Sequence, residues 1–209
     1  MKEPGDEAEG EAPNARQLQK ARTREALLAA ARKVLRKRGF AKTTTREVAR
    51  EAGVAAGTVF VHFRDVDALV EALLDEHIAA ALEGARRTMP KGGDLVARLV
   101  HVSKKLYDSY AAEPELSREY LSASLFRAEA GGPADQRLAD FQAWVSTEIM
   151  EAVSAGRCPP IDLRLAFGAF FSLYFGVLVA GLRGQLTRKD QLALLDASLR
   201  RLFNLEVTP

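Results

Sequence analysis

Apolar residues recur at helical spacing along most of the chain, and no stretch alternates with the period of two that is typical of a strand. The apolar stripe Leu27, Ala30, Ala31, Val34 and Leu35 predicts a helix from Thr23 to Arg38, with Thr23 as its cap. The same periodicity predicts eight further helices, over residues 44–52, 55–61, 65–87, 95–113, 115–128, 134–155, 161–182 and 188–204. We therefore expect an all-α fold of about nine helices.

One short segment has the pattern of two helices joined by a tight turn. Residues 44–63 read TTREVAREAGVAAGTVFVHF. Thr44 and Glu47 have the spacing of a capping box, and Gly53 supplies the stop between the two helices. A second short helix held in this way is presented as a probe for the major groove of DNA. The motif therefore predicts a helix-turn-helix.

The distribution of charge agrees with a nucleic-acid contact. The net charge of the 209 residues is only +2, yet residues 14–50 carry twelve Lys and Arg against two acids, net +10. The 47% apolar and 28% charged composition is typical of a soluble globular protein. Residues 1–15 are acidic and rich in Gly, Ala and Pro, so we expect a disordered tail and no secretory signal. The single cysteine, Cys158, agrees with a cytoplasmic location.

Residues 23–74 resemble the DNA-binding domain of the tetracycline-repressor-like (TetR) family. The resemblance rests on a helix that ends in Arg38-Gly39-Phe40 and on a series of family-typical residues in the right order: Thr43-Thr44-Thr45, Val48-Ala49, Ala52-Gly53-Val54, Gly57-Thr58-Val59-Phe60, His62-Phe63 and Ala68-Leu69. It implies a homodimer with a three-helix N-terminal domain, residues 16–64, and a helical ligand-binding and dimerisation domain, residues 65–209. It also implies a repressor that leaves a pseudo-palindromic operator when a small molecule binds.

Several residues are placed to contact DNA, because helix N-termini, hydroxyls and arginines are good phosphate ligands. They are Thr43, Thr44, Thr45, Arg46 and Thr58 in the motif, and Arg22, Arg24 and Arg64 around it. The resemblance adds Ala55, Ala56, Gly57, Phe60 and His62 as candidate DNA contacts. Phe60 stands where the family usually has Tyr, and Ala55 where it usually has Ser. Ala56 and Val66 stand where Lys is common. The second helix of the motif is thus poor in polar groups that read bases, and phosphate contacts should carry much of the affinity.

The C-terminal part carries many aromatic residues that are candidates for an apolar ligand pocket. These residues are Tyr107, Tyr110, Phe126, Phe141, Trp144, Phe170 and Tyr174. Few inward positions are ionisable, which disfavours a polyanionic ligand, although an arginine such as Arg127 or Arg183 could turn inward. No nucleophile motif, phosphate-binding loop or metal-ligand spacing is present, so neither an enzyme, a metal nor a cofactor is expected.

The segment Leu165–Leu182 holds eighteen residues without a charge, which meets the lower limit for a membrane span. A buried helix of a soluble dimer explains it better, and the resemblance implies that position in the dimer, without a membrane. Small residues on this helix and leucines on the last helix are the expected dimer contacts: Gly168, Ser172, Gly176, Ala180, Leu192, Leu195, Leu199 and Leu202. Two alternatives to the ligand-released repressor remain, a constitutive DNA-binding regulator and a DNA binder that reads only shape.

Overall fold

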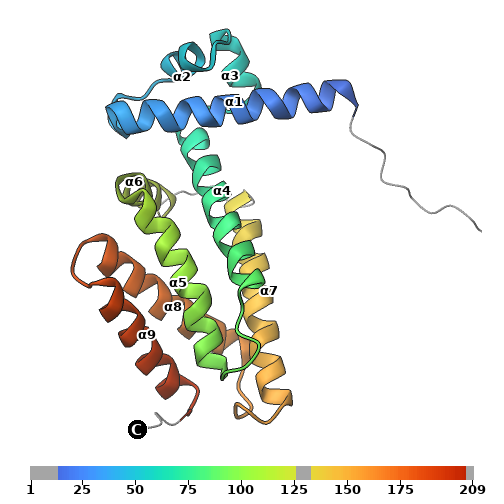
Figure 1. Ribbon diagram of the computed structural model, residues 1–209, viewed down its shortest axis with the longest axis vertical. Coiled ribbons are helices and arrows are strands. Elements are labelled where there is room, and N and C mark those ends of the chain that lie inside the picture. The colour runs from blue at the N-terminus through green and yellow to red at the C-terminus, as the bar shows by residue number, and fades with distance from the viewer. Residues whose placement is uncertain (1–13, 126–132, 206–209) are drawn as a thin grey trace, which may run out of the picture. The chain divides into compact units, whose positions relative to one another are not determined.

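The computed structural model describes residues 14–125 and 133–205, and the chain divides into two compact units, Met1–Leu69 and Val70–Pro209. All regular structure in the described ranges is helical (Figure 1), as the apolar periodicity predicts. The boundary between the units lies inside α4, Val66–Arg87.

The N-terminal unit contains three helices and the start of α4. They are α1 (Ala15–Arg38), α2 (Thr45–Ala52) and α3 (Ala56–His62), with a short 3-10 turn, η1 (Phe40–Lys42), after α1. The apolar side of α1 packs on α2, and Leu27, Val48 and Val59 are fully buried between the three helices. This small core fixes α3 on the surface of its unit.

The first helix begins eight residues earlier than the periodicity predicts, at Ala15 instead of Thr23. A capping box starts it: the Asn14 side chain accepts from Gln17 N–H at 2.9 Å, and the Gln17 side chain accepts from Asn14 N–H at 2.8 Å. Thr23 is no cap, because its hydroxyl donates to Gln19 O inside the helix. The expected disordered tail is therefore wrong for residues 14 and 15, and its remainder, residues 1–13, lies outside the described residues.

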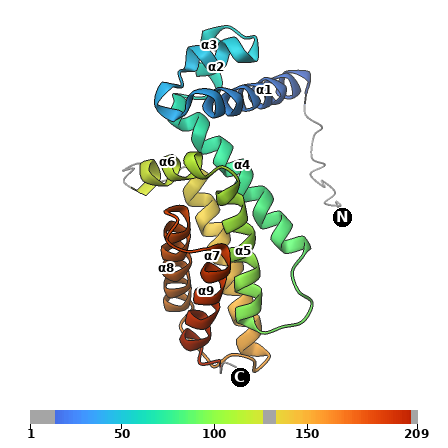
Figure 2. The same cartoon turned by 60° about the vertical axis from the view of Figure 1, so that its left-hand side comes forward.

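The C-terminal unit is built from the rest of α4 and five more helices (Figure 2). These are α5 (Leu95–Ala112), α6 (Pro114–Leu125), α7 (Pro133–Ser154), α8 (Leu163–Leu182) and α9 (Arg188–Leu202). Asp94, Asp162 and Thr187 cap α5, α8 and α9 by accepting from backbone N–H groups.

Aromatic rings fill the centre of this unit. The rings of Phe141, Phe170 and Tyr174 lie within 6.2 Å of one another, and Phe170 is completely buried. Polar contacts then join helices that are distant in sequence. Arg98 on α5 binds both carboxylate oxygens of Glu148 on α7, at 2.6 and 2.8 Å. Arg200 on α9 donates to Asp94 at 2.6 Å.

Candidate DNA interface and ligand pocket

The turn between α2 and α3 presents α3 to solvent. Gly53 has φ +69°, a left-handed conformation that an L side chain rarely adopts, and Val54 N–H donates to Ala49 O to close the turn. Ala55 precedes α3 and provides no side-chain cap. The first backbone N–H groups of α3 therefore have no competitor from the Ala55 side chain for an anion.

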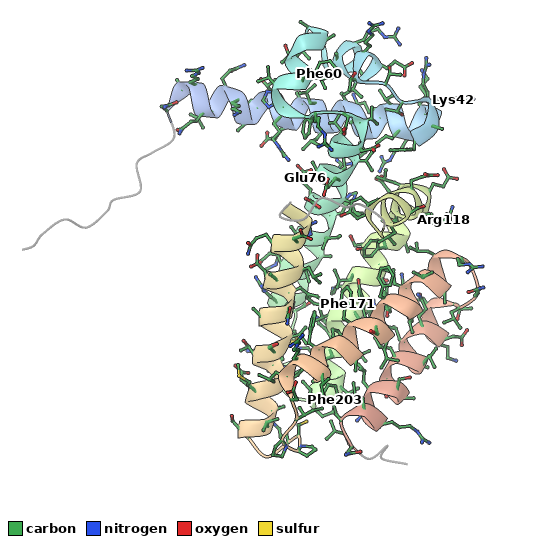
Figure 3. The ribbon with its side chains drawn as sticks, turned by 180° about the vertical axis from the view of Figure 1, so that it is seen from behind. Lys42, Phe60, Glu76, Arg118, Phe171 and Phe203 are labelled. Carbon is green, nitrogen blue, oxygen red and sulfur yellow. The ribbon has the colours of Figure 1, made fainter. Side chains whose placement is uncertain are left out.

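Most of the predicted DNA contacts lie on the surface of the N-terminal unit. The exposed ones are Arg22, Arg24, Thr44, Arg46, Ala55, Ala56, Gly57, Phe60 and Arg64, and Thr45, Thr58 and His62 are half-buried. Phe60 is 58% exposed and is labelled on α3 in Figure 3. Its neighbour Val61, which sequence reasoning did not select, is 70% exposed. The outer side of α3 is thus mainly apolar, and helical spacing from Gly57 would have been the signal for Val61.

Thr43 does not fit the role predicted for it. It is 8% exposed, and its hydroxyl donates to Gly39 O at 2.8 Å, so it holds the turn after α1. Thr44 caps α2 as predicted, with its hydroxyl oxygen 3.3 Å from Glu47 N–H. The Glu47 side chain does not complete the box through the Thr44 backbone. Its carboxylate instead accepts a hydrogen bond from the Thr44 hydroxyl and pairs with Arg38.

Part of the basic block is used inside the unit. Arg38 and Lys33 on α1 pair with Glu47 and Glu51 on α2, and these contacts help to hold α2 on α1. Other basic groups gather near the end of α3. The Arg24 guanidinium lies over the Phe63 ring, 5.2 Å from its centre. Desolvation, and then the positive charges of Lys20 and Arg24, lower the pKa of His62.

The C-terminal unit contains a pocket of about 210 Å³, lined from α4, α5, α6, α7 and α8. Three of the predicted ligand residues line it, Tyr110, Phe141 and Tyr174. Phe171, labelled in Figure 3, also lines it, together with Phe175. Burial raises the pKa of Tyr110, so its hydroxyl stays protonated and can donate to a ligand.

Among the described residues, the other predicted ligand residues, Phe170, Trp144 and Tyr107, do not line this pocket. Phe170 is a core residue, and Trp144 donates to Glu148 at 3.1 Å while the Arg86 guanidinium lies 4.8 Å from its ring centre. Phe126 lies outside the described residues. The Tyr107 hydroxyl donates to Tyr174 O at 2.9 Å, and Tyr107 lines a different pocket. Sequence reasoning missed Arg137, which pairs with Asp75 and makes one edge of the pocket polar.

The predicted dimer contacts separate into two groups. Gly168, Ser172 and Gly176 are exposed on one side of α8, and Ala180 is half-buried. Leu195 and Leu199 are fully buried inside the unit, so the structure excludes them as contact surface. Leu192 and Leu202 are half-buried. The helical period predicts the apolar stripe on α9 correctly, but it does not show that this stripe faces the chain's own core.

Helix α8 is, within the described ranges, the one helix that is long and apolar enough to cross a membrane. Its most apolar stretch is 39% buried in the unit. The exposed apolar part includes Leu165, 71% exposed.

Residues 27–73 match the sequence model of the bacterial regulatory proteins of the tetR family. The matched range covers α2, α3 and the second half of α1, together with the beginning of α4. It therefore contains the whole helix-turn-helix described above.

Solved structures resemble the chain over most of its length. The tetR-family repressor FadR from Thermus thermophilus, in complex with lauroyl-CoA, is 23% identical, with a TM-score of 0.65 over 89% of this chain and 96% of that one. FadR from Bacillus subtilis, in complex with stearoyl-CoA, is 19% identical, with a TM-score of 0.63 over 88% and 99%. RolR in complex with resorcinol is 17% identical, with a TM-score of 0.67 over 90% and 91%.

At these identities the likeness concerns the fold. Together with the family match over residues 27–73 and the geometry of α1 to α3, it gives the chain a helix-turn-helix domain of the tetR family at the N-terminus, followed by an all-helical second unit with the fold of these regulators.

Proposed function

We propose that the chain is a cytoplasmic, dimeric repressor that binds a pseudo-palindromic operator and is released from it by a small apolar or aromatic ligand. The observation that carries the DNA-binding part is the exposed side of α3, held by the Gly53 turn. Arg24 lies over the Phe63 ring at the end of α3, and Arg46 is exposed in the first turn of α2. Two such helices in a dimer would enter successive major grooves. Because α3 offers few polar base readers, we expect a strong dependence of affinity on salt.

The ligand part of the proposal rests on the pocket lined by Tyr110, Phe141 and Tyr174. Its volume of about 210 Å³ lies below the ~300–1,000 Å³ common for ligand pockets, so a single aromatic ring suits it as it stands. Resorcinol in RolR is such a ligand, whereas the long acyl chains in the two FadR complexes would require the pocket to widen. Release of DNA by the ligand requires that each weakens the binding of the other.

The first test is selection of DNA from a random duplex pool with the full chain at moderate salt. We expect enrichment of an inverted repeat with one fixed half-site spacing. The recovered fragment then serves to screen single-ring aromatic compounds for release, with a Tyr110→Ala variant to link release to the pocket. Enrichment without release by any compound would favour a constitutive regulator. Binding without enrichment at any salt would favour a reader of DNA shape and contradict the repressor proposal.

The dimer proposal places the exposed side of α8, with Gly168, Ser172 and Gly176, against its two-fold mate. A Ser172→Arg substitution would place a charged, bulky side chain in that interface, and we expect light scattering to show a monomer. Ser122→Arg makes the same change at an exposed position of α6 and should leave the dimer intact. A Ser172→Arg chain that remains a dimer, or a wild-type chain that partitions into detergent, would contradict this interface.

A further inference from the structure

A second pocket, of about 340 Å³, lies between α5, α6 and the turn that joins α8 to α9. Apolar groups form one part of its wall, among them Leu178 and Leu182. Three arginines form another part: Arg118 from α6, which is labelled in Figure 3, Arg183 from the end of α8, and Arg188 from the start of α9. No acidic side chain is among the eleven described residues that line it.

One wall of this pocket depends on a close approach at Gly181. The buried Gln191 side chain crosses α8 there and donates to Val177 O at 2.9 Å. A Cβ on residue 181 would lie 1.9 Å from Gln191 Nε2, so only glycine leaves room for this side chain. The Oε1 atom of Gln191 in turn accepts from Arg188 Nη1 at 2.6 Å. Gly181 and Gln191 thereby fix the position of Arg188 at the pocket.

The arginines retain donors for a ligand. Arg188 uses Nη1 for Gln191 and Nε for Asp108, at 3.0 Å, and lies 5.4 Å from the Tyr107 ring centre. Arg118 donates through Nη1 to Leu182 O at 3.0 Å. The exposed Arg183 guanidinium makes no hydrogen bond or ion pair with the described part of the chain. Since a guanidinium has five N–H donors, the three side chains leave most of theirs available.

We propose that this pocket binds a small organic anion, whose carboxylate or phosphate group lies on Arg118, Arg183 and Arg188 and whose apolar part lies on Leu178 and Leu182. Guanidinium groups recognise both anions through paired, charge-assisted hydrogen bonds. The apolar wall selects an anion that carries a hydrocarbon or aromatic group over a bare inorganic ion. The site therefore takes a chemical class of ligand that the apolar pocket does not.

The two pockets are separated by a pair of stacked rings. Tyr107 lines the arginine pocket, Tyr174 lines the apolar pocket, and their ring centres are 5.3 Å apart at an interplanar angle of 5°. The hydrogen bond from the Tyr107 hydroxyl to Tyr174 O holds this pair together. Because the two pockets are separate, binding at the arginine pocket can be measured on the free chain, without DNA and without a ligand in the apolar pocket. The result of that measurement therefore does not depend on the proposed repressor function.

The test is isothermal titration calorimetry of the full chain with three related probes: phenyl phosphate, phenylacetate and neutral phenylacetamide. We expect at least one anion to bind about tenfold more tightly than the amide, because only the anion gains charge-assisted hydrogen bonds. Arg183→Gln and Arg118→Gln should each weaken the binding of the anion about tenfold and leave the affinity for the amide unchanged. Tighter binding of phenyl phosphate would identify the ligand class of this pocket as a phosphate ester, and tighter binding of phenylacetate would identify it as a carboxylate.

Arg157→Gln is the matched control, because Arg157 is an exposed arginine of the same unit that lies outside the pocket. Its anion affinity should equal that of the wild type. Both arginine substitutions in the pocket are at exposed positions, so circular dichroism should show an unchanged fold. The proposal is overturned if no probe binds, if the amide binds as tightly as the anions, or if Arg183→Gln and Arg118→Gln bind the anions as tightly as Arg157→Gln does.

Discussion

The two units use aromatic side chains in opposite ways. On α3 of the N-terminal unit, Phe60 is 58% exposed and its ring has no aromatic neighbour among the described residues. In the C-terminal unit, Phe170 is fully buried and its ring lies 6.1 Å from those of Phe141 and Tyr174. An exposed ring adds little to folding and is available to a partner, whereas a buried ring contributes mainly stability. The same residue type thus indicates binding in one unit and packing in the other.

The largest effect expected from this difference is on stability. Phe170→Ala should lower the free energy of unfolding of the C-terminal unit by about 3–5 kcal/mol, because it leaves a cavity among packed rings. Phe60→Ala makes the same chemical change on the surface, and we expect it to alter stability by no more than about 0.5 kcal/mol. Urea unfolding followed by circular dichroism measures both. Equal losses in the two variants would contradict the division between a binding ring and a packing ring.

Removal of the contact between α5 and α9 should lower the free energy of unfolding by less. Although burial opposes it, hydrogen bonds from Ala97 N–H and Arg200 lower the pKa of Asp94 in the folded chain. Asp94→Ala should destabilise the C-terminal unit by about 1–2 kcal/mol through the lost cap and the lost ion pair. Asp162→Ala on α8 removes a cap that no guanidinium of the described residues contacts, and the loss of stability should be smaller.

The direction of the pH dependence follows from the sign of that shift. Because the pKa of Asp94 is lower in the folded than in the unfolded chain, its stabilisation is complete above the unfolded value and is lost as the pH falls through the folded value. The difference in unfolding free energy between the wild type and Asp94→Ala should therefore shrink as the pH falls below about 4. A difference that stays constant down to pH 2 would assign the effect to packing alone.

The two units also differ in how far the sequence predicts them. The cap at Thr44 and the turn at Gly53 involve residues no more than five positions apart, so their local pattern is enough to place α2 and α3. The first two turns of α1 have few buried side chains, so apolar periodicity does not predict a helix there. The Asn14–Gln17 capping box was the signal that could have found this start.

In the C-terminal unit the helices were predictable and their contacts were not. The hydrogen bond between Tyr107 and Tyr174 joins residues 67 positions apart, and the Arg98–Glu148 pair joins residues 50 apart. A helical period shows which side of a helix is apolar, but it does not show which helix covers that side. For this reason Leu195 and Leu199 were assigned to a dimer surface although they face the core, and the three arginines of the second pocket were not grouped.

A single hydroxyl group tests whether the α3 ring faces phosphate. Phe60→Tyr restores the residue that the tetR family usually has at this position, and we expect about fivefold tighter binding to the selected operator, the effect of one added hydrogen bond. Fluorescence anisotropy with the labelled fragment measures the change. A neutral hydroxyl releases no counterion, so the slope of log affinity against log salt should stay the same. Unchanged or weaker binding would show that the Phe60 ring does not lie beside the backbone of the DNA.

The smallest expected effect concerns His62, at the end of α3. Desolvation and the charges of Lys20 and Arg24 lower its pKa, so the imidazole of the free chain is neutral at pH 7. DNA phosphate near this ring would favour the protonated form. Operator affinity should then increase as the pH falls from 7.5 to 5.5, by about fivefold at most for one half-exposed charge.

The variant His62→Gln isolates this contribution, because glutamine keeps a hydrogen-bonding side chain but does not titrate in that range. Anisotropy titrations of both proteins at constant ionic strength should give a pH-dependent affinity for the wild type and a flatter one for the variant. Equal pH profiles would mean that His62 packs against Phe63, whose ring centre is 6.4 Å away, and does not face the DNA. In that case the surface of α3 that meets the groove would end at Val61, and the arginines around it would carry the phosphate contacts alone.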